Sequence, residues 1–201
     1  MDIFKKEYDF RVFLFRLKEN LFPDQKNRPS LSKSERRRKP LPPNSFDLIS
    51  YCLMPNHFHL LIRQKTNLPI TKLISKICTG YSKYFNKEYK RIGAVFQDQF
   101  KAVLIENNEQ LLWTSFYIHK NPLEAKLVKF LENYKWSSYL DYCDLESNKL
   151  CNKSIILGQF KSPISYLKYF ENKENNTRIS FKSFDTKMTI VPTIVPKLNV
   201  V

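Results

Sequence analysis

Two histidines separated by one residue are the first candidates for chemistry. His57 and His59 flank Phe58 within residues 51–62 (YCLMPNHFHLLI). Residues i and i+2 of a β-strand point to the same face, so a strand here places the two imidazoles side by side. Two neutral imidazoles on one face can bind a divalent metal ion. The alternative is a pair of polar side chains on a solvated strand face, and the spacing alone does not decide between them.

A second group of polar residues lies in residues 117–122 (YIHKNP). Tyr117 and Asn121 are four residues apart, so on a helix they share one face. If that helix packs across the histidine strand, a phenol and an amide lie beside the metal ion, an arrangement suited to phosphoryl transfer. Tyr117 can also be an ordinary core aromatic, and Asn121 can be the N-cap of a helix opened by Pro122. We interpret His119, on another side of the helix, as structural.

Hydrophobic periodicity and turn residues predict the elements that must position these side chains. We expect helices at 9–21, 69–89, from Asn107 or Asn108 onward, 123–128, 136–139 and 164–170. Strands are expected at 46–53, 57–64, 93–96 and 100–105, with a tight turn at Pro55-Asn56 that makes a hairpin of the first two. This order is that of a ferredoxin-like fold without its opening strand. The prediction is therefore an α+β fold, an antiparallel sheet with helices on one face, plus a C-terminal helical extension.

We place a domain at 1–145, a small helical extension at 146–172 and a flexible tail at 173–201. No apolar run approaches the length of a membrane span, and the N-terminus has no signal-peptide pattern. The four cysteines include no C-x-x-C pair, so we expect a cytoplasmic protein with reduced thiols.

The charge of the chain indicates a nucleic-acid partner. Lysine and arginine number 34 against 19 acids, a formal net charge of +15, with 14% aromatic residues. Three glycines and no Gly-rich phosphate loop argue against a nucleotide-binding fold. Five basic residues are candidate phosphate contacts, although exposed basic residues are usually just solvated. Arg36, Arg37 and Arg38 lie in the Pro-rich basic loop at 23–44, and the other two are Arg91 and Lys101.

Four stretches in the same order and spacing resemble a known family. They are residues 51–62, 93–101 (GAVFQDQFK), 117–122 and 136–139 (WSSY). Together they look like the REP-associated tyrosine transposases, which belong to the HUH (His-hydrophobe-His) single-strand DNA transposases with one catalytic tyrosine. The resemblance spans roughly residues 3–170.

The resemblance implies a metal-dependent endonuclease that acts in DNA transposition and recombination. His57, His59 and Asn121 align with the metal-binding residues, for Mg²⁺ or Mn²⁺, and imidazole nitrogen favours Mn²⁺. Tyr117 aligns with the nucleophile, which forms a 5′-phosphotyrosine and frees a 3′-hydroxyl. The implied substrate is single-stranded DNA beside an imperfect hairpin, and the active unit is a monomer or a homodimer.

The chain departs from the family pattern in two places. Its start corresponds to a point after the family's first strand, which we expect to reflect a misassigned start, a truncated copy or another segment that fills the gap. Gln99 stands where the family has an arginine, with Lys101 nearby. Two alternatives therefore stay open: an inactive or domesticated protein that binds hairpin nucleic acid without cutting it, and a basic module without metal.

Overall fold

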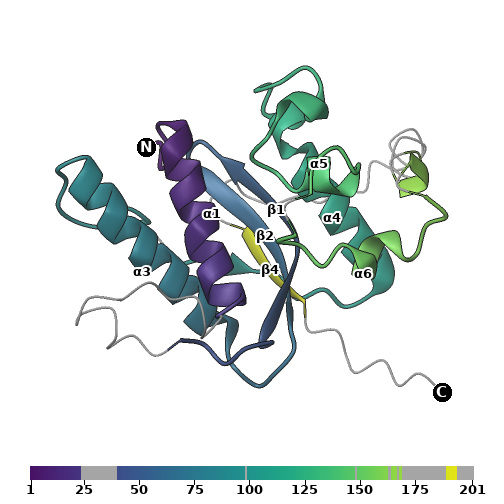
Figure 1. Cartoon of the computed structure of the whole chain (residues 1–201), viewed down its shortest axis with the longest axis horizontal. Coiled ribbons are helices and arrows are strands. Elements are labelled where there is room, and N and C mark those ends of the chain that lie inside the picture. Colours follow the sequence, from purple (N-terminus) through teal and green to yellow (C-terminus); the bar gives the residue numbers. More distant parts are fainter. Residues whose placement is uncertain are drawn as a thin grey trace. The chain divides into compact units, whose positions relative to one another are not determined.

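The structure is a computed structural model, and it describes residues 1–23, 40–97, 99–147, 149–162, 164–166, 168 and 189–193, the last as backbone. The chain forms two compact units (Figure 1). The first comprises Met1–Asp47 and Gln64–Gln99, and the second Leu48–Arg63 and Phe100–Val201.

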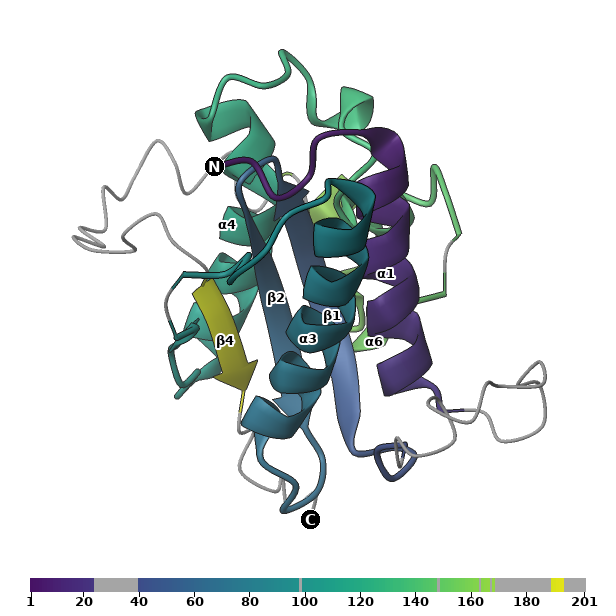
Figure 2. The ribbon, with the colours of Figure 1, turned by 90° about the vertical axis from the view of Figure 1, so that its left-hand side faces the viewer.

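Two helices form the first unit, α1 (Glu7–Leu21) and α3 (Ile70–Glu88), which run side by side (Figure 2). Both predicted helices are confirmed to within two residues. Their apolar stripes meet in an aromatic layer, because the Phe13 ring lies 5.4 Å from both Phe4 and Tyr81. Edge-to-face ring pairs of this kind contribute beyond their buried area.

A buried carboxylate joins the start of α1 to α3. Asp9 is 0% exposed and accepts hydrogen bonds from the backbone N–H groups of Lys5 (2.8 Å) and Lys6 (3.0 Å). It also accepts from the hydroxyls of Tyr84 (2.6 Å) and Tyr89 (2.7 Å). Burial by itself would raise the pKa of Asp9, but these four bonds, led by the one from Tyr84, lower it. Asp9 is therefore ionised and stabilises the first unit.

Strands β1 (Phe46–Met54) and β2 (His57–Gln64) are joined by the two-residue turn Pro55-Asn56. This is the predicted antiparallel hairpin, and the α+β class is confirmed. Strand β3 (Lys101–Ala102) is shorter than predicted, and the described residues at 93–96 include no strand. Gly93 has a φ of 100°, a turn conformation that extended backbone does not adopt.

Strand β4 (Thr189–Thr193) was not predicted, because it lies within the expected tail. It lies between β2 and β3 and runs parallel to both, with Leu60 opposite Ile190 and Lys101 opposite Thr189. The sheet is therefore not purely antiparallel. In ferredoxin-like topology the opening strand has the place between these two strands, and here β4 occupies it. Residues 173–188 and 194–201 lie outside the described residues.

Helix α4 (Asn108–Glu124) begins at the predicted cap, where the Asn107 side chain accepts from the Gln110 N–H at 2.8 Å. The predicted break at Pro122 and the separate helix at 123–128 are wrong, because α4 runs through Pro122. Pro122 has no N–H to donate to the Ile118 carbonyl, so α4 lacks that helical hydrogen bond in its last turn. The remaining short helices are η1 (Leu131–Asn133), α5 (Tyr139–Tyr142) and α6 (Ser154–Leu157). None of the described helices is both long and apolar enough to cross a membrane.

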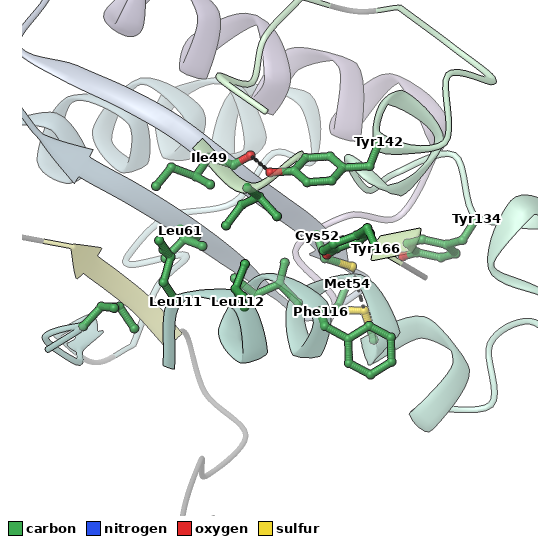
Figure 3. Close-up of a cluster of buried hydrophobic side chains, with 13 residues drawn as sticks. Ile49, Cys52, Met54, Leu61, Leu111, Leu112, Phe116, Tyr134, Tyr142 and Tyr166 are labelled. Carbon is green, nitrogen blue, oxygen red and sulfur yellow. Dashed lines mark hydrogen bonds between the residues drawn. The ribbon is translucent and has the colours of Figure 1, made fainter. Parts of the chain in front are cut away.

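The core of the second unit lies between α4 and the hairpin (Figure 3). Leu111, Leu112 and Phe116 of α4 share this buried cluster with Ile49 of β1 and Leu61 of β2. Such packing fixes the face of α4 that is turned away from solvent.

A buried polar chain also ties α4 to β1. His119 is 0% exposed, and its Nε2 lies 2.7 Å from the Ser138 hydroxyl oxygen, which accepts from the Tyr51 N–H at 2.9 Å. Its Nδ1 lies 3.2 Å from the Tyr166 hydroxyl, which lies 3.2 Å from that of Ser115. Burial lowers the pKa of His119 to about 3, so the ring is neutral. His119 is thus structural, as the sequence predicted.

We expect Asp9→Asn to lower the free energy of unfolding by at least about 2 kcal/mol at pH 7, because charge-assisted bonds to a buried group are lost. The lowered pKa of Asp9 means that its ionised form stabilises the fold above the unfolded-state pKa of about 3.9. That contribution is lost as the pH falls through the folded-state pKa. The difference in free energy of unfolding between the unsubstituted protein and Asp9→Asn should therefore become smaller below about pH 4. Urea unfolding at several pH values measures this, with the exposed Asp2→Asn as control. A gap that is constant with pH would contradict it.

A double-mutant cycle tests the polar chain at His119. We expect His119→Phe and Ser138→Ala each to cost about 1–3 kcal/mol and to be coupled by at least about 0.5 kcal/mol, because they break the same hydrogen bond. Ser137→Ala is the matched control, since the buried Ser137 hydroxyl accepts from Tyr139 N–H and not from His119. Chemical unfolding of the four proteins gives the coupling. Additive losses for His119 and Ser138 would show that the chain does not act as a unit.

Candidate active site

The first and third residues of β2 bring the two histidines together. His57 Nε2 and His59 Nε2 lie 3.0 Å apart, and the ring centroids are 4.8 Å apart. The prediction that both side chains share one strand face is confirmed. His59 is 3% exposed and His57 is partly exposed, while Phe58 between them is fully buried.

Both imidazoles are neutral at physiological pH. Burial lowers the pKa of His57. Burial and then the neighbouring His57 lower the pKa of His59 to about 3, against a smaller opposing effect of the Asn121 side chain. A neutral imidazole is the form in which histidine binds a metal ion.

The donor geometry fits a divalent ion. Two adjacent ligands of an octahedral ion with bonds of about 2.1 Å lie about 3.0 Å apart, which matches the separation of the two Nε2 atoms. Among the residues that the structure describes, no group of three or more His, Cys, Asp or Glu side chains could hold a metal. An ion held by the two histidines would therefore need amide, water or substrate oxygen atoms as its other ligands.

Tyr117 of α4 lies beside this pair. Its ring centroid is 6.0 Å from that of His59, and the two rings are nearly perpendicular, at 80°. Burial, and then the negative charge of Glu124, raise the pKa of Tyr117. The phenol is therefore protonated at neutral pH, and an attack by its oxygen on an electrophile would require the loss of that proton.

Asn121 lies one helical turn after Tyr117, as predicted, and its Nδ2 donates to the Tyr117 carbonyl oxygen at 2.7 Å. This bond uses the nitrogen of the amide. The same side chain favours the protonated form of His59, which is the effect of an oxygen acceptor. Its alternative role as the N-cap of a helix opened by Pro122 is wrong, because α4 does not end there.

The candidate phosphate contacts are less well defined. Lys101 is exposed on β3. Arg91, in the first unit, contacts its own unit, with its guanidinium 5.8 Å from the Phe85 ring and Nη1 2.8 Å from Met1 Sδ. Arg36, Arg37 and Arg38 lie outside the described residues. All five remain predictions.

The contacts of Ser138 and Tyr166 were not predicted from the sequence, and Asn56 was assigned only to the turn before the histidines. Ser138 and Tyr166 hold His119, and Asn56 lies 2.6 Å from the His57 ring through its Oδ1. Ser138 belongs to a motif that carries the family resemblance, and Asn56 directly precedes the histidines, so both positions were available as signals. Tyr166 carries no such signal, because its contacts come from distant parts of the chain.

Comparisons with known proteins indicate a similarity to transposases. The family described as "Transposase IS200 like" matches residues 35–121, a range that includes both histidines, the tyrosine and Asn121. A protein of Haemophilus influenzae named "Putative REP-associated tyrosine transposase" is 24% identical over 106 residues. The match covers 47% of this chain and 59% of that relative, so the chain spans less than two thirds of its length. No solved structure matches the chain significantly.

The resemblance to the tyrosine transposases is thus confirmed by two independent matches, and both agree on the class of protein. Residues 35–121, somewhat less than half of the chain, are similar to the IS200-like transposase family.

Proposed function

We propose that the protein is a DNA strand transferase in which Tyr117 attacks a phosphodiester of single-stranded DNA beside a divalent metal ion. One observation carries the proposal: a tyrosine from α4 and two histidines from β2 meet, with ring centroids 4.8 Å and 6.0 Å apart. Tyr117 lies about 60 residues after the two histidines in the sequence, so the fold brings the three rings together.

The reaction balances without an energy source. The Tyr117 hydroxyl oxygen forms a bond to phosphorus as the bond from phosphorus to the 3′-oxygen breaks, which gives a 5′-phosphotyrosine and a free 3′-hydroxyl. The phenolic proton leaves to solvent, and the leaving oxygen takes one up. Because the new ester keeps the energy of the phosphodiester, a 3′-hydroxyl can later attack it and rejoin DNA without ATP.

His57 and His59 would hold the ion, with the Asn121 amide oxygen as a third ligand. When bound, the ion neutralises phosphate oxygens and makes a phenolate beside it less costly. The chain itself holds the Tyr117 phenol beside the neutral imidazoles. The burial of His59 excludes water from its side of the proposed metal site. Two nitrogen donors favour Mn²⁺ over Mg²⁺.

The partner that we propose is single-stranded DNA with a hairpin, bound in the cytoplasm by a monomer or a homodimer. The net charge of +15 supports an extended phosphate partner, since neutralised phosphates supply most of the affinity for nucleic acid. A protein that binds such DNA without cutting it is the alternative, and the following experiments distinguish the two.

Tyr117→Phe should abolish covalent capture of DNA, because it removes the attacking oxygen and keeps the ring. The measurement is the fraction of a labelled hairpin-bearing single strand that stays on the protein in a denaturing gel after incubation with Mn²⁺. Tyr8→Phe, at an exposed tyrosine of α1, is the control and should form the adduct normally. Tight DNA binding without an adduct in the unsubstituted protein would establish the alternative function instead.

His57→Ala should reduce adduct formation by more than about 100-fold, as expected for the loss of a metal ligand. DNA affinity should change by less than about threefold, because basic residues dominate it. Fluorescence anisotropy at two salt concentrations measures affinity beside the adduct assay, and a thermal melt checks the fold. His57 is preferred to His59 because it is partly exposed. If binding and adduct formation fell equally, the histidine would serve DNA binding and not catalysis.

A further inference from the structure

We propose that Asn56 is a positioning residue that sets the tautomer of His57. Its amide oxygen accepts the Nδ1 proton of that ring and leaves the Nε2 lone pair facing His59. The consequence for metal binding rests on the proposed function, but the tautomer itself does not.

The contact geometry assigns the protons. Asn56 Oδ1 lies 2.6 Å from His57 Nδ1, and an amide oxygen can only accept. A neutral imidazole carries one N–H, so the proton is on Nδ1 and His57 Nε2 is bare. His59 Nε2, 3.0 Å away, must then be the donor of that pair. The assignment leaves His59 Nδ1 without a proton, and that atom is buried with no hydrogen-bond partner. A bare nitrogen is tolerated there more easily than an unpaired N–H.

The backbone gives no separate reason for an asparagine at this position. Asparagine is common in two-residue hairpin turns because it tolerates a positive φ. The described non-glycine residues with positive φ do not include Asn56; they are Asn44, Lys90, Lys126, Asp144 and Lys149. Asn56 is also exposed, so its side chain fills no core position. What its side chain does contact is the His57 ring.

The tautomer matters because a metal ion needs the lone pair on Nε2. With Asn56 in place, the Nε2 lone pair of His57 is available before an ion arrives, whereas His59 must release its Nε2 proton or move it to Nδ1 when an ion binds. A ring free to place its proton on either nitrogen would spend part of its time in the wrong form. Carboxylate or carbonyl partners of this kind contribute about 10–100-fold to metal affinity.

The tautomer can be measured directly in the full chain without metal or DNA. Two-bond ¹H–¹⁵N correlation spectra at pH 8 distinguish protonated from bare ring nitrogens. We expect His57 to be protonated at Nδ1 and His59 at Nε2. Asn56→Ala should shift His57 towards the Nε2–H form, whereas Asn56→Asp, which keeps an acceptor, should retain the Nδ1–H form. Asn67→Ala, at an exposed loop residue, is the matched control and should change nothing.

Calorimetric titration with Mn²⁺ gives the second readout. Asn56→Ala should weaken binding by about 10-fold or more, and Asn56→Asp should preserve it. A His57 tautomer that is unchanged in Asn56→Ala would overturn the proposal, whatever the metal affinity. If the unsubstituted protein shows the expected tautomers but binds no Mn²⁺ and forms no adduct, the proposed function fails and the role of Asn56 in setting the tautomer stands.

Discussion

The hydrogen bond between His119 and Ser138 sets where α4 lies on β1. Ser138 in turn accepts from the Tyr51 backbone, so the imidazole links the helix to a strand backbone that cannot move by itself. Successive helical residues turn by about 100°, so Tyr117 points roughly opposite to His119. One side of α4 is thereby held in the core while the other presents a phenol to the histidines. The apolar contacts of Leu111, Leu112 and Phe116 add burial but less direction, because dispersion contacts are not directional.

The side chains of the candidate site are uncharged in the absence of ligands. Burial keeps His57 and His59 neutral and keeps the Tyr117 phenol protonated. Within the described residues, no cluster of carboxylates supplies a permanent negative charge for a cation. In the proposed reaction, an ion bound there would share its charge with phosphate oxygens, so metal and DNA would reinforce each other's binding. This differs from a carboxylate-rich site, which binds its cation before the substrate arrives.

Strand β4 of the sheet was not predicted from its local sequence, although the neighbouring strands need a pairing partner there. In a ferredoxin-like sheet the opening strand pairs with the strand that corresponds to β2, and without a neighbour there the backbone donors and acceptors of β2 would be unpaired at a cost in free energy. Strand β4 pairs with β2 and β3 in that place, although its direction is parallel. Pro192, opposite Ile62, has no N–H to donate, so the pairing is weaker than a full ladder. Nothing in residues 189–193 predicted this role, because the unpaired edges of β2 and β3 are apparent only when the whole sheet is assembled.

By itself, the sequence determined helices α1 and α3, the start of α4, the hairpin of β1 and β2, and one part of the site. The i, i+2 spacing of His57 and His59 placed them on one face, and the i, i+4 spacing of Tyr117 and Asn121 did the same on α4, because these relations follow from strand and helix geometry alone. The break expected at Pro122 did not occur, since the cost of a proline depends on its position within the finished helix. Tertiary structure alone decided that α4 crosses β2, that His119 binds Ser138, and that Asn56 meets His57. The first two contacts join residues whose separation along the chain carries no periodic signal, so only packing and the need to satisfy buried polar groups bring them together. Asn56 and His57 are neighbours in the sequence, and the directions of their side chains at the turn decide their contact.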